Sequence, residues 1–149
     1  MDVLSHSIIF RPGTVSGAVT KQERHSVDFT VNGESLLDKL VKSDGGHADF
    51  MGCMVLGFPE QNAQAVNMLV CVQPPDSESG RVLFYVCPEC GDLGCGAYGA
   101  FVERTGSTYV WRDFAYENGC DDPRFLTDIG PFVFESTLYE SEVLRAGTL

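Results

Sequence analysis

The sequence predicts an α+β fold: a single domain over residues 1–149, built on an antiparallel sheet with two or three short helices. Strand-like runs of β-branched and aromatic residues fill the second half of the chain, and no helical segment stands between them to make crossover connections. Two segments of the first half instead have apolar residues at helical spacing. A length of 149 residues is enough to bury a hydrophobic core without cross-links.

The first helix is expected directly after the tight turn at Asn32-Gly33. Ser35 can cap its N-terminus, and Asp38 stands three residues later, which is a weaker form of the capping box. Gly45-Gly46 should end the helix, because glycine readily stops a helix. Its apolar stripe consists of Leu36, Leu37, Leu40 and Val41.

Further helices are expected after Pro59, which suits the first turn of a helix, and over residues 138–144. Residues 68–72 fit a helix or a strand, and residues 51–58 fit a strand or a buried loop. The aromatic residues Trp111, Phe114 and Tyr116 are expected in the core or on the sheet. The remaining strands are predicted over residues 7–19 with internal turns, 27–31, 81–86, 97–104, 107–114 and 132–134.

The balance of charge excludes several kinds of partner. Ten basic residues stand against 21 acidic ones, which gives a formal net charge of −11. Such a chain repels the phosphates of nucleic acids and anionic membranes, and it attracts cationic proteins. Because the N-terminus lacks a secretory signal and no long apolar span follows, a cytoplasmic protein with reduced cysteines is expected.

Acidic residues are concentrated in the C-terminal third, where Arg124 is the only basic residue between Asp113 and Glu142. We interpret this region as an acidic face that covers the active site of a basic toxin such as a nuclease, as an inhibitor or immunity-type protein would. Tyr116 is the candidate aromatic anchor. The alternative is that the charge serves solubility alone. The candidate partner-binding residues are Asp113, Tyr116, Glu117, Asp121, Asp122, Asp128 and Glu135.

A second hypothesis rests on a glycine-rich cysteine turn between two predicted strands. Cys87-Pro88-Glu89-Cys90-Gly91 has the form of a zinc knuckle, in which a tight turn directs two thiolates at one tetrahedral ion. Cys95 would be the third ligand, and either Cys120 or His47 the fourth. A retroviral-type knuckle would place its last ligand where this chain has Ala100.

Two other interpretations of the cysteine turn remain open. Its thiols could be small, reduced packing residues, as Cys53 and Cys71 are expected to be in the core. Cys87 and Cys90 could also cycle between dithiol and disulfide with Asp92 or His47 nearby, although no helical pattern follows to lower a thiol pKa. The chain contains no nucleophile elbow, Walker loop or dinucleotide fingerprint, so an enzyme is disfavoured.

Three segments also carry a resemblance: residues 84–97 around the cysteine turn, Val110-Trp111-Arg112-Asp113-Phe114, and Ile129-Gly130-Pro131-Phe132. With them the chain resembles a group of small, uncharacterised bacterial proteins that share such a turn, a tryptophan strand and a Gly-Pro-Phe segment. Some of these proteins are labelled oxidoreductases. The resemblance covers roughly the C-terminal half, with a weaker echo at residues 33–37, and it implies no established activity.

Overall fold

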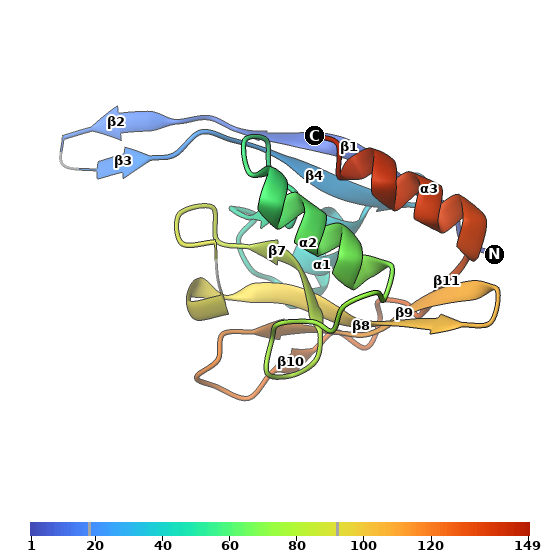
Figure 1. The fold of residues 1–149 in the computed structure, drawn as a ribbon. Helices are drawn as coiled ribbons and strands as arrows, with labels where there is room; N and C mark the ends of the chain where they lie inside the picture. Colours follow the sequence, from blue (N-terminus) through green and yellow to red (C-terminus); the bar gives the residue numbers. More distant parts are fainter. Residues whose placement is uncertain (18, 92) are drawn as a thin grey trace.

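Two antiparallel sheets form the frame of the protein in the computed structural model, which describes residues 1–17, 19–91 and 93–149 (Figure 1). The smaller sheet has the order β1-β4-β5, and the larger has the order β10-β9-β8-β7-β6 with β11 also paired to β9. Every strand pair in the described ranges is antiparallel. The predicted α+β class is confirmed, with three helices beside the sheets.

The smaller sheet is formed by β1 (Leu4–Arg11), β4 (Arg24–Val31) and β5 (Glu34–Ser35). The connection from β1 to β4 contains a second hairpin, β2 (Thr14–Ser16) and β3 (Val19–Lys21), which extends beyond the body of the protein in Figure 1. The predicted turn after β4 is present, with positive φ at both of its residues, Asn32 and Gly33. Such a turn matches the twist of the two strands that it joins.

The larger sheet contains most of the strands predicted for the second half. Its members are β6 (Met51–Gly52), β7 (Val82–Val86), β8 (Ala97–Thr105), β9 (Thr108–Glu117), β10 (Arg124–Phe125) and β11 (Phe132–Glu135). The β8–β9 hairpin turns at Gly106-Ser107, since Thr105 pairs with Thr108. This turn lies one residue later than the sequence predicted.

Each helix begins and ends close to where the sequence places it. They are α1 (Leu36–Asp44), α2 (Pro59–Leu69) and α3 (Ser136–Ala146). Ser35 caps α1 by accepting a hydrogen bond from the Asp38 amide, and Gly45 ends it in the left-handed conformation. Among the described residues, no helix is long and apolar enough to cross a lipid bilayer.

Trp111 lies where both sheets and α3 meet, and it is fully buried, as are most of the aromatic residues around it. Its ring packs against Phe29 of the smaller sheet, Phe84 of the larger sheet and Phe134 of β11, with centroid distances of 5.6, 4.6 and 4.8 Å. Its indole N–H donates to the Tyr139 hydroxyl on α3 at 3.0 Å. The predicted core role of Trp111 is therefore confirmed.

The irregular segment of residues 51–56 joins the two sheets. Met51 and Gly52 pair with the end of β7, and the segment then runs along β4, where the Val27 amide donates to the Met54 carbonyl at 3.0 Å. The Leu56 amide donates to the His25 carbonyl at 2.8 Å. Both alternatives for this stretch thus hold in part, because a two-residue strand is followed by a buried loop.

Gly52 is required by the close approach of this segment to β4. A Cβ atom at Gly52 would lie 1.8 Å from the Val27 carbonyl oxygen, which belongs to the backbone and cannot move aside. We therefore expect Gly52→Ala to lower the free energy of unfolding by about 3 kcal/mol or more. The measurement is urea denaturation followed by tryptophan fluorescence.

Gly33→Ala is the matched control for this prediction. Gly33 has φ of +82°, but a Cβ there would meet no atom within 4 Å. Its substitution should therefore cost only the backbone strain of about 1–2 kcal/mol. Equal losses in the two variants would contradict the steric role of Gly52.

Candidate metal centre

The cysteine turn connects β7 to β8 and spans residues 87–96, as the sequence predicted for two neighbouring strands. The Gly91 amide donates to the Cys87 carbonyl at 2.8 Å, and Gly91 has φ of +68°. A short 3₁₀ turn at Leu93–Cys95 then leads into β8. Asp92, one of the side chains considered for this site, lies outside the described residues.

Three of the predicted ligands converge in this turn. The Sγ atoms of Cys87, Cys90 and Cys95 all lie within 4.8 Å of one another. Cys90 and Cys95 are exposed, whereas Cys87 is partly buried at the end of β7. The group could hold a metal ion, because it presents sulfur ligands to one point in space.

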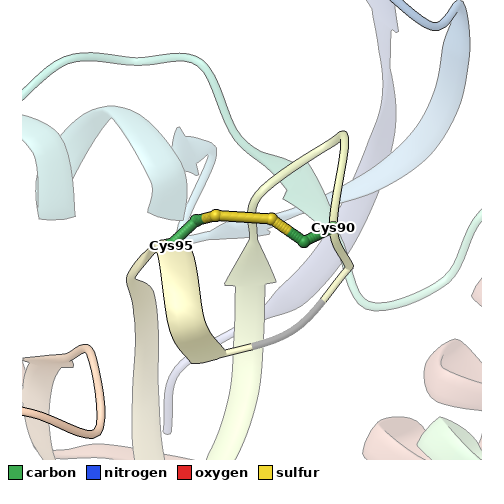
Figure 2. Close-up of a disulfide and its surroundings, with 2 residues drawn as sticks. All are labelled: Cys90 and Cys95. Atoms are coloured by element: carbon green, nitrogen blue, oxygen red, sulfur yellow. A yellow bond between two sulfur atoms is a disulfide. The ribbon is translucent and has the colours of Figure 1, made fainter.

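Cys90 and Cys95 form a disulfide, and Figure 2 shows the two side chains facing each other across the turn. The cysteines were expected to be mainly reduced, and the redox alternative for the turn paired Cys87 with Cys90; the structure instead joins Cys90 to Cys95. The reversal of the chain through Gly91 and the 3₁₀ turn brings Cys95 back to Cys90. The free cysteines are Cys53, Cys71, Cys87 and Cys120.

The two candidates for a fourth ligand lie outside the sulfur group, which is formed by three cysteines alone in the described parts of the chain. Cys120 is exposed in the turn after β9, where its amide donates to Asn118 Oδ1 at 3.0 Å. His47 stacks on Phe50 with a centroid distance of 5.0 Å, and its Nδ1 accepts from the Asp49 amide. The fourth position is thus open in this arrangement.

The cysteine turn is bound to the smaller sheet by Arg11, the last residue of β1. Arg11 is 9% exposed, and its guanidinium donates to Glu89 Oε1 at 2.9 Å and to Asp49 Oδ1 at 2.8 Å. Hydrogen bonding to Arg11 is the main cause that lowers the pKa of both carboxyl groups. Glu89 also accepts from the Gln22 amide at 3.1 Å, so β1 and the β3–β4 connection both hold the turn.

Arg24 adds a second attachment, because its Nε donates to the Pro88 carbonyl at 3.1 Å. Sequence reasoning missed both arginines, since they lie more than 60 residues before the turn in the chain. The available signal was Glu89 itself, an acidic residue between two cysteines with no basic neighbour in sequence.

The other end of the cysteine turn, at Gly96, contacts the side chain of Tyr116. Gly96 has φ of +96°, and a Cβ there would lie 2.0 Å from the Tyr116 hydroxyl oxygen, so only glycine fits. The Tyr116 ring packs edge-on against Tyr98 at 5.5 Å, and the Arg124 guanidinium lies 4.0 Å from its centroid. Tyr116, the predicted anchor for a partner, therefore supports the cysteine turn within the molecule.

Most of the predicted acidic contact residues also have partners within the chain. Glu117 is buried and lies 3.6 Å from Arg81, and Asp113 pairs with its neighbour Arg112. Asp128 accepts a hydrogen bond from Ser43, and Glu135 caps α3 by accepting from the Thr137 and Leu138 amides. These four carboxylates thus bind groups of their own chain.

Several of the predicted acidic residues lie near opposite ends of β9. Glu135 pairs with Thr108 at the first residue of β9, while Asp121 and Asp122 follow Glu117 at its last residue. A ten-residue strand spans about 30 Å, which separates these groups. Asp121 and Asp122 are exposed in the turn after β9, where Asn118 Nδ2 donates to Asp121 at 3.1 Å.

Two adjoining pockets of about 180 and 250 Å³ lie beside the cysteine turn and share Met51, Val55, Gln61 and Gly91. The second pocket is also lined by Cys90 and Arg24. Small molecules can therefore reach the edge of the sulfur group from solvent.

The other cysteines differ from this group. Burial raises the pKa of the Cys53 thiol to about 12, so that it is protonated at neutral pH. Cys71, expected in the core, is instead exposed, because it follows the end of α2 with φ of +62° and lies at the surface.

Comparison of the chain with protein-family models, with curated proteins and with solved structures gave no match.

An ion pair near the turn predicts how stability depends on pH. Arg124 binds both carboxylate oxygens of Asp44 at 2.8 Å and is the main cause that lowers the pKa of Asp44. Because the pKa is lower in the folded state, the pair stabilises the fold above the unfolded-state pKa of about 3.9, and this contribution is lost as pH falls through the folded-state pKa.

We expect Asp44→Asn to lower the free energy of unfolding by about 1–2 kcal/mol at pH 7 and to flatten its decline below pH 4. The measurement is the urea midpoint from pH 2.5 to pH 7. Asp122→Asn, at an exposed position, is the control and should follow the wild-type profile. A wild-type profile for Asp44→Asn would show that the ion pair does not contribute.

Proposed function

We propose that the protein is a metal-binding protein that holds one zinc ion through Cys87, Cys90 and Cys95 in their reduced state. The observation that carries the proposal is the convergence of three Sγ atoms within 4.8 Å. Thiolates bind zinc at about 2.3 Å, so two sulfurs of one tetrahedral site lie about 3.8 Å apart. Only small side-chain movements separate the observed group from that geometry once the disulfide is reduced.

The surroundings support a preformed site. Glu89 and Pro88 are held by Arg11 and Arg24, and Gly96 is held against Tyr116. These attachments use carboxylate, carbonyl and phenol atoms and involve none of the three sulfurs. The turn is therefore in place before a metal binds, and removal of the metal should leave the fold intact.

The open fourth position favours an exchangeable site over a closed structural one. Closed zinc sites have four protein ligands, whereas sites with three keep a position for water or another small ligand. The pocket at Cys90 gives such a ligand access from solvent. Alternatively, the turn that contains Cys120 could move toward the sulfur group and supply the fourth ligand. The Cys120→Ser variant distinguishes a water ligand from a Cys120 ligand.

Reduced protein should bind one equivalent of Co²⁺ or Zn²⁺, with thiolate-to-cobalt absorption in the near ultraviolet. Cys87→Ser, Cys90→Ser and Cys95→Ser should each weaken zinc binding at least about 100-fold, because each removes a thiolate ligand. Affinity should also fall as pH is lowered, since the thiols must lose protons to bind. The measurements are competitive titration with a chromogenic chelator and cobalt spectroscopy.

Cys71→Ser is the matched control, because Cys71 is an exposed cysteine outside the sulfur group. It should bind zinc like the wild type. Cys120→Ser tests the fourth position and should also leave affinity unchanged if water fills it. Absence of cobalt binding by the fully reduced wild type would refute the proposal.

The net charge supports a second proposal, an acidic inhibitor that binds a basic protein such as a toxin domain. The exposed pair Asp121 and Asp122 is the candidate contact, because it projects beyond the end of β9. Carboxylates at such a position speed the encounter with a cationic cleft.

A basic protein should copurify with the chain from its host at low salt, and the chain should inhibit that protein's activity. Asp121→Lys with Asp122→Lys should weaken the complex at least about tenfold, an effect that fades with added salt. Asp76→Lys with Glu78→Lys makes the same charge change on another exposed loop and is the control. Equal effects of the two pairs would point to net charge in place of a specific contact.

A further inference from the structure

We propose that oxidation controls the metal site: the Cys90–Cys95 disulfide and the metal-bound trithiolate are two alternative states of the same turn, and a hydroperoxide converts the second into the first with release of the metal. This inference rests on the proposed zinc site and adds its regulation. It follows from one overlap, since the two sulfurs joined in the disulfide are also two of the three in the candidate metal group.

The two states exclude each other for a chemical reason. Zinc is bound by thiolates, and a sulfur in a disulfide has given up that charge. Formation of the Cys90–Cys95 bond therefore leaves Cys87 as the only thiolate of the group. A single thiolate cannot retain the ion against water, so the metal must leave.

Oxidants can reach the turn from solvent. Cys90 and Cys95 are both exposed, and the pocket of about 250 Å³ reaches Cys90. Cys87 is partly buried at the end of β7. Cys53 is held protonated by burial, so it does not compete for the oxidant.

The frame of the turn tolerates both states. Pro88 and Glu89 are held before Cys90, and Gly96 is held after Cys95, so the attachments flank the part that changes. Gly91, with φ of +68°, lies between the two cysteines and provides a reversal that few other residues adopt. The exchange therefore needs rearrangement within residues 90–95 and no loss of the contacts to the smaller sheet.

The electrons balance with hydrogen peroxide as oxidant. The Cys90 thiolate attacks one peroxide oxygen, the O–O bond breaks, and Cys90 sulfenic acid and hydroxide form. The Cys95 thiolate then attacks the Cys90 sulfur, the S–O bond breaks, and the disulfide and a second hydroxide form. Two electrons pass from sulfur to the peroxide, the buffer acid protonates both hydroxides to water, and the metal leaves as the hydrated divalent cation.

The test uses the full chain, reduced and loaded with one equivalent of Zn²⁺. Hydrogen peroxide is added while a chromogenic chelator reports free zinc, and peptide mass spectrometry maps the disulfides. We expect one zinc released and one Cys90–Cys95 disulfide formed for each peroxide consumed. Reduction of the disulfide with a phosphine, followed by removal of the phosphine, should restore the capacity of the protein to bind one zinc.

Two variants sharpen the result. Cys87→Ser should still form the Cys90–Cys95 disulfide but bind zinc at least about 100-fold more weakly, which separates the redox pair from the third ligand. Cys71→Ser, as the matched control, should release zinc with wild-type kinetics. Circular dichroism establishes that each variant is folded.

The outcomes separate the two proposals. Zinc binding that survives peroxide, or zinc release accompanied by a different disulfide, would overturn the redox control and leave the zinc site standing. A reduced protein that binds no zinc would overturn the zinc site, and the control of it by oxidation would fall with it, even if the disulfide formed reversibly.

Discussion

The backbone of residues 51–56 is the connection on which the arrangement of the whole molecule depends. It pairs with β7 through Met51 and with β4 through Met54 and Leu56, so the two sheets are held by hydrogen bonds as well as by the aromatic core around Trp111. Gly52 permits this pairing because it has no Cβ atom to collide with the Val27 carbonyl. Because β7 leads directly into the cysteine turn, the same connection sets the turn beside β1 and the start of β4, within reach of Arg11 and Arg24.

The few basic residues of this acidic chain act largely within it. Arg11, Arg81 and Arg124 each bind a carboxylate that is far away in the sequence, and they thereby fix the turn, the β7 start and the end of α1. The remaining carboxylates leave a negative surface. Such a surface raises the local concentration of cations, metal ions as well as basic proteins. The two proposed functions thus draw on one physical property, and the cysteine turn adds the specific ligands that the charge alone lacks.

Local sequence signals predicted the elements whose cause is local. Helix α1 begins after Ser35 and ends before Gly45 as expected, since capping acts over three or four residues. The cysteine turn joins the two predicted strands. The prediction failed where distant contacts decide. Cys71 was expected inside and is exposed, and Cys120, one of two candidates for the fourth ligand, lies outside the sulfur group. In each case the position of β9 or of the end of α2 against other elements sets the result.

The sequence by itself determined the α+β class, the order of strands and helices, and the proximity of three cysteines, because capping, turn formation and close spacing operate within short stretches of chain. Only the tertiary structure decided that Cys90 pairs with Cys95, that Arg11 and Arg24 hold the turn, and that Glu117 pairs with Arg81. These outcomes depend on contacts between residues that are distant in sequence or on the path of a turn in space. No local pattern of residue types encodes either one.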